Sequence, residues 1–297
     1  MFCKNSFILK TKKKPAFTLP EVLLTLLIIG LIAAVTIPIL LGYFEQQKFL
    51  SGLKKAYTQF NQALIGTAHD FTCTGDLICT GLFKVGTTSQ TLGTELVKHF
   101  NVLKNCETNT LGCFSESVSD SYDGSLARTD DYAKISSGFY RFISADGIAF
   151  ILKNNHNNCS SSMSTGVTQN MEQVCGELYI DLNGLKPPNN MGKDIFRFYI
   201  TNGKGPLLYP SGGIDDQENG HWKNGDTAQH CFPSDTDGNY CAARIIEEGW
   251  KMDYLANISS LAAAPLSEDP PEEEEEEDPV TPPPDPPSPP GGCIACQ

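Results

Sequence analysis

The amino-acid sequence predicts an α+β protein, with a long N-terminal helix packed on an antiparallel-sheet head and a disordered tail after it. Three observations lead to this prediction. The charge-free run Val22–Leu41 continues into apolar residues at helical spacing as far as about residue 70. Short β-branched and aromatic segments, separated by Gly, Asn and Ser, then follow. The C-terminal residues are mainly prolines and acids, which cannot form a core.

The composition limits the class of protein. The chain has 297 residues, a net charge of −13 and 11 cysteines. This length is sufficient for a substantial core. The acidic balance argues against nucleic acid as a partner, because phosphate binding requires clustered Lys and Arg. The many cysteines indicate an oxidising compartment.

The N-terminal region is typical of a single-pass membrane protein. Five lysines and no acid precede residue 17, and the run Val22–Leu41 contains 20 residues without a charge. A helix of that length spans about 30 Å, the thickness of a bilayer hydrocarbon core. The preceding lysines place the N-terminus in the cytoplasm and the head outside. The run is longer than that of a signal peptide, and a plain signal anchor is the alternative.

A specific motif lies where the basic leader meets the apolar run. It reads Lys14-Pro15-Ala16-Phe17-Thr18-Leu19-Pro20-Glu21 and ends in a carboxylate at the edge of the span. A carboxylate there is costly in lipid and marks a functional position with a cationic partner. The motif resembles the prepilin cleavage and methylation motif of type IV pilins and type II secretion pseudopilins.

The resemblance implies processing at a defined bond. The leader would be cut between Ala16 and Phe17, and the new amine of Phe17 would be N-methylated. Glu21 is then the fifth residue of the mature chain, and Gly30 and Pro38 stand where pilins commonly have Gly and Pro. Ala16 stands where the family usually has Gly, a small-for-small change. The resemblance covers about the first 40 residues.

The resemblance also implies a function, a location and partners. The protein is expected to be a pilin-like structural subunit of a type II secretion pseudopilus or a type IV pilus. Its location would be the bacterial inner membrane, single-pass, with head and tail on the outer side, before assembly into a periplasmic or surface filament. The implied partners are prepilin peptidase, an inner-membrane assembly platform and other pilin-like subunits bundled through the helix.

Two other functions remain open from the sequence. One is a minor pilin that acts as an adhesin, and the other is a membrane-anchored ectodomain that binds calcium or a glycan and forms no filament. No phosphate loop, nucleophile motif or triad spacing is present in the sequence, so no enzyme activity is expected.

Beyond the membrane span the helix is expected to continue to about residue 70 as an amphipathic half. Its apolar residues recur at steps of three and four: Leu50, Leu53, Tyr57, Phe60 and Leu64. This stripe is expected to pack on the sheet, with Lys54, Lys55 and Gln59 off it. Pro38 removes one intrahelical hydrogen bond and predicts a kink or local melting.

The expected parts of the chain follow from these boundaries. They are a basic leader at 1–16, a membrane half of the helix at 17–44, an amphipathic half at 45–70, a disulfide-stapled head at 71–262 and a disordered tail at 263–297. Within the head the patterns predict a helix over 94–101, a hairpin of strands 139–143 and 148–152 turning at Asp146-Gly147, strands over 178–182 and 195–200, and a closing helix over 244–257.

Eight cysteines fall in the head in pairs of short separation. Nearest-neighbour disulfides that close surface loops are therefore the predicted pattern, among 105 possible connectivities. The expected pairs are Cys73–Cys79, Cys106–Cys113, Cys159–Cys175 and Cys231–Cys241. No cluster of Cys and His has a zinc-like spacing. In the tail, Cys293 and Cys296 form a lone C-x-x-C, expected to be a local disulfide or a cross-linking pair.

Two loops contain the residue types that bind calcium. One holds Asp181 and Asn183, and the other holds Asp235, Asp237 and Asn239, where oxygen-bearing side chains alternate. The second loop does not continue as an EF-hand, because Ile246 stands where the closing Glu would be. Asx turns without a metal are therefore preferred. No cofactor is expected apart from this calcium candidate.

Overall fold

A computed structural model describes most of the chain between residues 18 and 255. The described ranges are 18–109, 112–115, 117–125, 138–155, 157–203, 207–217, 220–223, 230–232 and 237–255. The chain divides into two units, Met1–Ala263 and Ala264–Gln297. The predicted leader and tail lie outside the described residues, and so do Ala16, Phe17, Asp235, Cys293 and Cys296.

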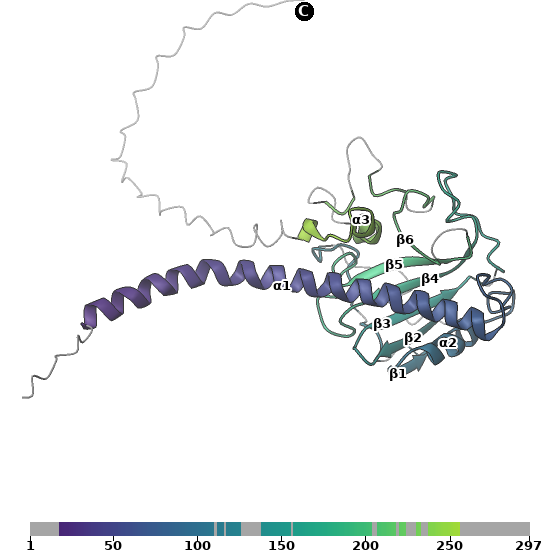
Figure 1. Cartoon of the computed structure of the whole chain (residues 1–297), viewed down its shortest axis with the longest axis horizontal. Helices are drawn as coiled ribbons and strands as arrows, with labels where there is room; N and C mark the ends of the chain where they lie inside the picture. The colour runs from purple at the N-terminus through teal and green to yellow at the C-terminus, as the bar shows by residue number, and fades with distance from the viewer. Residues whose placement is uncertain are drawn as a thin grey trace, which may run out of the picture. The chain divides into compact units, whose positions relative to one another are not determined.

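The helix α1 spans Leu19–Asp70 and contains 52 residues. At 1.5 Å per residue its length is about 78 Å. The predicted end near residue 70 is correct. The helix is continuous through Pro38, so the local melting predicted there does not occur. Figure 1 shows instead a gentle curve along the N-terminal half. A long helix can lose the one backbone hydrogen bond at Pro38 and curve without breaking.

The two halves of α1 have different surroundings. The first buried side chain is that of Gln46, and the residues before it are exposed with few exceptions. The exposed half is long and apolar enough to cross a membrane. From Phe49 onward, one face of the helix is buried against the head, while Lys54 and Lys55 remain exposed. The helix is thus a single element with a free half and a packed half.

The head is built on one antiparallel sheet of six strands in sequence order. Its strands are β1 (Val102–Glu107), β2 (Phe139–Ser144), β3 (Ala149–Asn154), β4 (Val174–Asp181), β5 (Ile195–Thr201) and β6 (Leu208–Pro210). The predicted hairpin is confirmed, with Phe142 opposite Phe150. Its turn contains Gly147 at φ +84°, a conformation that glycine adopts without strain. Figure 1 shows α1 lying across one face of this sheet.

The core lies between the packed half of α1 and the sheet. Phe60 stacks on Phe150 of β3 with ring centroids 5.7 Å apart. Tyr57 meets Phe198 of β5 at 5.7 Å and donates its hydroxyl to the carbonyl of Leu208 at 3.1 Å. The predicted stripe is confirmed, with Tyr57 only partly buried. The structure adds small residues on the same face, which let the helix approach the sheet closely: Ala56, Ala63 and Ala68.

Some elements differ from the sequence prediction. The helix expected over 94–101 is α2 (Ser89–Leu96), continued by the 3₁₀ turn η1 (Val97–His99). It starts earlier because Thr88 caps it, accepting a hydrogen bond from the amide of Thr91 at 3.2 Å. The sequence pattern does not reveal β1, because this edge strand has almost no buried side chain and so no alternation of apolar and polar residues. It does not reveal β6, because three residues are too few to show a pattern.

The C-terminal part of the head also differs. The closing helix expected over 244–257 is α3 (Cys241–Glu247), followed by the 3₁₀ turn η3 (Asp253–Leu255). The helix stops early because Gly249 and Trp250 have φ of +78° and +63°. Positive φ takes the chain out of the right-handed helix. The turn η3 returns to α1, where Gln46 donates to the carbonyl of Met252.

Four disulfides join cysteines that are neighbours in the sequence. The pairs are Cys73–Cys79, Cys106–Cys113, Cys159–Cys175 and Cys231–Cys241. They are the pairs that the spacing predicts. Each closes a short loop of the head, so they staple the irregular segments locally and do not link distant parts of the chain.

The packing of Phe60 generates the first prediction. Phe60→Ala leaves a cavity between α1 and β3, and it should lower the free energy of unfolding by about 3–5 kcal/mol. Denaturant unfolding of the detergent-solubilised chain, followed by the fluorescence of Trp222 and Trp250, measures this change. The matched control is Ile65→Ala, because Ile65 is 55% exposed on the same helix. Equal losses in the two variants would contradict the role given to Phe60.

Candidate functional site

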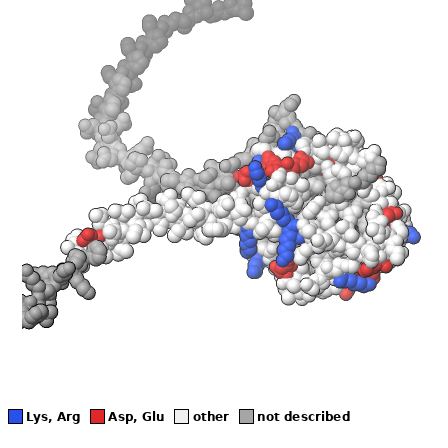
Figure 2. Space-filling view, in the orientation of Figure 1, with Lys and Arg blue, Asp and Glu red and all other residues white. Residues whose placement is uncertain are grey.

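The N-terminal tip of α1 carries a carboxylate at the start of its apolar half. Glu21 lies in the first helical turn, where the positive end of the helix dipole favours an anion. Its amide donates to the carbonyl of Thr18 at 3.1 Å. In the part of the chain that the structure describes, its carboxylate has no ion pair or side-chain hydrogen bond. Figure 2 shows acidic surface at this tip and uncharged surface along the visible apolar half.

The other polar side chains of the charge-free run Val22–Leu41 are satisfied within the helix. Thr25 donates its hydroxyl to the carbonyl of Val22 at 2.9 Å, and Thr36 donates to the carbonyl of Ile32 at 3.0 Å. Such internal bonds allow a hydroxyl to enter lipid at low cost. Among these side chains, Glu21 is therefore the one whose partner must come from outside the described residues.

Gly30 and Pro38 lie on the same exposed half of the helix. A Cβ built on Gly30 would meet nothing within 4 Å, so the glycine is not required by any contact inside the described chain. Small residues on a membrane helix allow close approach of a second helix. The structure thus places Glu21, Gly30 and Pro38 on one accessible apolar half, and Phe17 and the predicted cleavage bond lie outside the described residues.

The first calcium candidate forms a buried pair of acids with Asp194. Asp181 accepts hydrogen bonds from the amides of Asn183 at 3.1 Å and Gly184 at 2.8 Å. Asp194 accepts from the amides of Asn189 at 2.9 Å and Asn190 at 2.7 Å. The Oδ2 atom of Asp181 is buried and has no hydrogen-bond partner among the described residues. The two carboxyl groups therefore hold the loop between β4 and β5 from both ends.

The electrostatics of this pair favour a proton. Burial, followed by the nearby Asp194 carboxylate, raises the pKa of Asp181 well above its usual range, against two opposing amide hydrogen bonds. Burial also raises the pKa of Asp194. Two adjacent acids in a low dielectric cannot both ionise without a counter-charge. The pair thus needs either a proton on one carboxyl group or a bound cation.

The second calcium candidate is an Asx turn in its described part. The Oδ1 atom of Asp237 accepts hydrogen bonds from the amide and the side chain of Asn239, both at 2.9 Å. This turn packs closely on Gly192, where a Cβ would lie 2.9 Å from the Cα of Gly238. Within the described residues, no three His, Cys, Asp or Glu side chains are grouped to hold a metal. Calcium binding stays an untested alternative to the predicted Asx turns.

Comparison with known proteins adds no relative. No protein-family model matches the chain, and no curated protein or solved structure has significant similarity to it. Function is therefore inferred from the N-terminal motif and from the geometry of the helix and head.

The buried acid pair generates the second prediction. A carboxyl group whose folded pKa is raised contributes most to stability at low pH, and the contribution is lost as pH rises through that pKa. Asp181→Asn removes the ionisation and the repulsion from Asp194. It should therefore stabilise the head at pH 8, by about 1–3 kcal/mol, and flatten the fall of stability with rising pH.

Denaturant unfolding between pH 5 and pH 8 measures the free energy of unfolding of both chains. The expected difference is that of one buried polar group, about 1–3 kcal/mol. Asp253→Asn is the matched control, because Asp253 is exposed. A loss of stability at pH 8 in Asp181→Asn that exceeds the loss in the control would show that Asp181 is needed as an anion.

Proposed function

We propose that this chain is a pilin-like structural subunit of a type II secretion pseudopilus or a type IV pilus. Prepilin peptidase cleaves it between Ala16 and Phe17, and Phe17 is N-methylated. The single apolar helix holds it in the bacterial inner membrane with the head outside, and an assembly platform then packs it into a filament. The observation that carries the proposal is Glu21, a carboxylate without a partner among the described residues, at the tip of an exposed, uncharged helical half.

The exposed half of α1 supports helix bundling. From Leu19 to Phe44 the large apolar side chains are exposed, and among the described residues none of the head covers them. An apolar surface of this size is stable only in lipid or against other apolar helices. Because the other half of the same helix is anchored in the head, a bundle of these halves would carry the heads on its outside.

The position of Glu21 supports a defined register between subunits. Cleavage before Phe17 creates an amine four residues from Glu21, about 6 Å along a helix axis. In a staggered bundle, the carboxylate of one subunit can meet the amine of the next. A subunit out of register leaves both charges unpaired in low dielectric, which costs several kcal/mol per ion. One ion pair is therefore sufficient to select the stagger.

The head supports a structural role on the oxidising side of the membrane. Its four disulfides are all short-range staples of irregular segments around the sheet. Disulfides form and persist in oxidising compartments outside the cytoplasm, because the cytoplasm keeps thiols reduced. A minor pilin with an adhesive head is consistent with the same arrangement.

The buried acids favour a second candidate, a calcium-dependent head. One oxygen of Asp181 has no partner among the described residues, and a divalent cation bound there beside Asp194 would take the place of the carboxyl proton. If calcium binds there, the thermal midpoint of the wild-type head would rise on adding calcium at pH 8, and that of Asp181→Asn would not.

The third prediction concerns processing. Protein purified from membranes of its native host should lack residues 1–16 and carry one methyl group on Phe17. Intact-mass analysis and N-terminal sequencing measure both changes. A chain that retains Met1, or one that is cut at another bond, would contradict the proposal directly.

The fourth prediction concerns assembly. Glu21→Ala should abolish filament formation while leaving cleavage largely intact, because the carboxylate is needed for register and lies beyond the scissile bond. Electron microscopy of sheared filaments and immunoblotting of the processed form measure the two effects. Glu45→Ala is the matched control, since Glu45 is an exposed acid on the same helix just outside the apolar half. Normal filaments from Glu21→Ala would exclude the ion-pair mechanism.

A further inference from the structure

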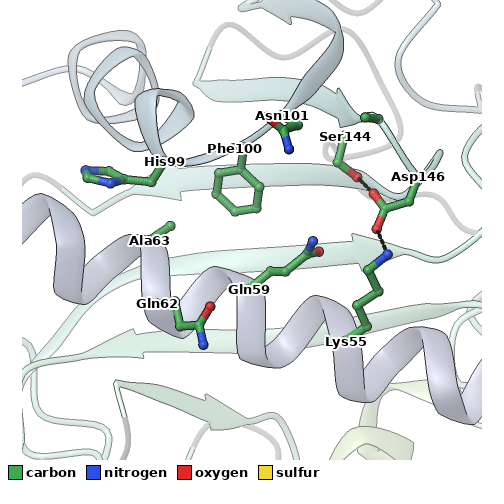
Figure 3. A pocket seen from close by; sticks show the side chains of 10 residues that line it. Lys55, Gln59, Gln62, Ala63, His99, Phe100, Asn101, Ser144 and Asp146 are labelled. Carbon is green, nitrogen blue, oxygen red and sulfur yellow. Dashed lines mark hydrogen bonds and ion pairs between the residues drawn. The ribbon is translucent and has the colours of Figure 1, made fainter.

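The head contains a polar groove that neither the helix-assembly role nor the N-terminal motif uses. It has a volume of about 440 Å³ and lies beside the packed half of α1. Its walls come from three segments: Lys55, Gln59 and Gln62 of α1, the segment His99–Asn101 after α2, and Ser144–Asp146 at the β2–β3 turn. Figure 3 shows these side chains around one hollow, with the ring of Phe100 behind it. The volume is within the range of small-molecule sites.

The groove presents amide groups with unused hydrogen-bonding capacity. The side chains of Gln59, Gln62 and Asn101 have no hydrogen bond to any described residue. The Oε1 atom of Gln59 is also buried, so neither the described residues nor bulk solvent satisfies it. A buried acceptor without a partner costs about 1–3 kcal/mol. A ligand that donates to Gln59 would recover this energy once the amide has turned to present Oε1 to the groove.

The two charged groups at one end of the groove neutralise each other. The Nζ atom of Lys55 lies 2.6 Å from Oδ2 of Asp146. Against the effect of its burial, hydrogen bonds from Lys55 and Ser144 hold the pKa of Asp146 below its usual range. The carboxylate of Asp146 is therefore already paired with Lys55, so this end does not select for a charged ligand.

The opposite end is closed by a histidine. The Nε2 atom of His99 lies 3.0 Å from Oδ2 of Asp70. Its ring packs directly over Gly66, where a Cβ would be 2.7 Å from Nδ1 of His99. In Figure 3, His99 and the Lys55–Asp146 pair flank the amides from opposite sides. The groove is therefore bounded, and Lys55 and Gln62 are about 10 Å apart along the helix axis.

We propose that this groove binds a small neutral carbohydrate. Side-chain amides without partners offer both donors and acceptors, which match sugar hydroxyl groups. The ring of Phe100 packs on Phe142 and Phe150 and also lines the groove, where it offers apolar contact to a pyranose ring. The bounded length and the paired charges fit a short saccharide better than an extended or charged peptide. The site lies away from the exposed half of α1, so it is independent of the proposed assembly through Glu21.

The test measures saccharide binding to the full chain. The protein is solubilised in an amine-oxide detergent, because maltoside and glucoside detergents would compete. Saturation-transfer NMR is then recorded with glucose, galactose, mannose, N-acetylglucosamine, maltose, lactose and chitobiose, and with a neutral Gly-Ser pentapeptide. At least one saccharide is expected to bind saturably, with Kd in the millimolar range, and the pentapeptide is not.

The variants assign the binding to the groove. Gln59→Ala and Asn101→Ala should each weaken saccharide binding roughly tenfold, the effect of about one lost hydrogen bond. Gln59→Ala is expected to fold normally. The Oε1 atom of Gln59 has no hydrogen-bond partner among the described residues, so its removal leaves no other group unpaired. Gln47→Ala is the matched control, an exposed glutamine of the same helix outside the groove. Wild-type affinity is expected in that control, and circular dichroism checks that each variant is folded.

The outcomes that overturn the proposal are distinct. Absence of saturable binding to every saccharide would do so, as would equal affinity in folded Gln59→Ala and the wild type. Binding of the pentapeptide without any saccharide would assign the groove to a protein partner. Failure of the saccharide test leaves processing and filament assembly unaffected, so it is separable from the proposed function.

Discussion

The packing of α1 residues 49–68 against the sheet is the interaction that supports every other part of the head. The aromatic contacts of Phe60 with Phe150 and of Tyr57 with Phe198 join the helix to two non-adjacent strands. Dispersion and burial at these contacts depend on close approach, which the alanines on the same helix face permit. With the second half of the helix held in this way, the first half extends away from the head as a continuation of the same rod.

This arrangement gives one helix two environments. A separate anchor joined by a flexible linker would allow the head to rotate freely, whereas a continuous helix transmits position from the apolar half to the head. The turn η3 reinforces the junction, because Gln46 donates to the carbonyl of Met252 where the buried face begins. In the proposed filament, a register selected by Glu21 at the tip would therefore also set the position of each head.

The same packing creates the polar groove of the head, and the acid pair is a separate local feature. The groove exists because the helix, the segment after α2 and the β2–β3 turn meet at one edge of the helix–sheet contact. The loop between β4 and β5 is held by Asp181 and Asp194, whose carboxyl groups accept four backbone hydrogen bonds. The groove side chains are positioned by elements far apart in the sequence, which is typical of binding sites on a rigid scaffold, whereas Asp181 and Asp194 lie at the two ends of one loop.

Features that depend on local pattern could be predicted from the amino-acid sequence alone. The helix, its apolar stripe, the Asp146-Gly147 hairpin and the short-range disulfides follow from periodicity, turn chemistry and spacing, each of which acts over a few residues. Features that depend on contacts between distant segments became visible only in the folded chain. The exposed edge strand β1 has no alternation to detect, and the early end of α3 depends on the positive φ of Gly249 and Trp250. The pairing of Asp181 with Asp194 and the convergence of Gln59 with Asn101 likewise arise only on folding, because burial and hydrogen-bond satisfaction are properties of the packed chain.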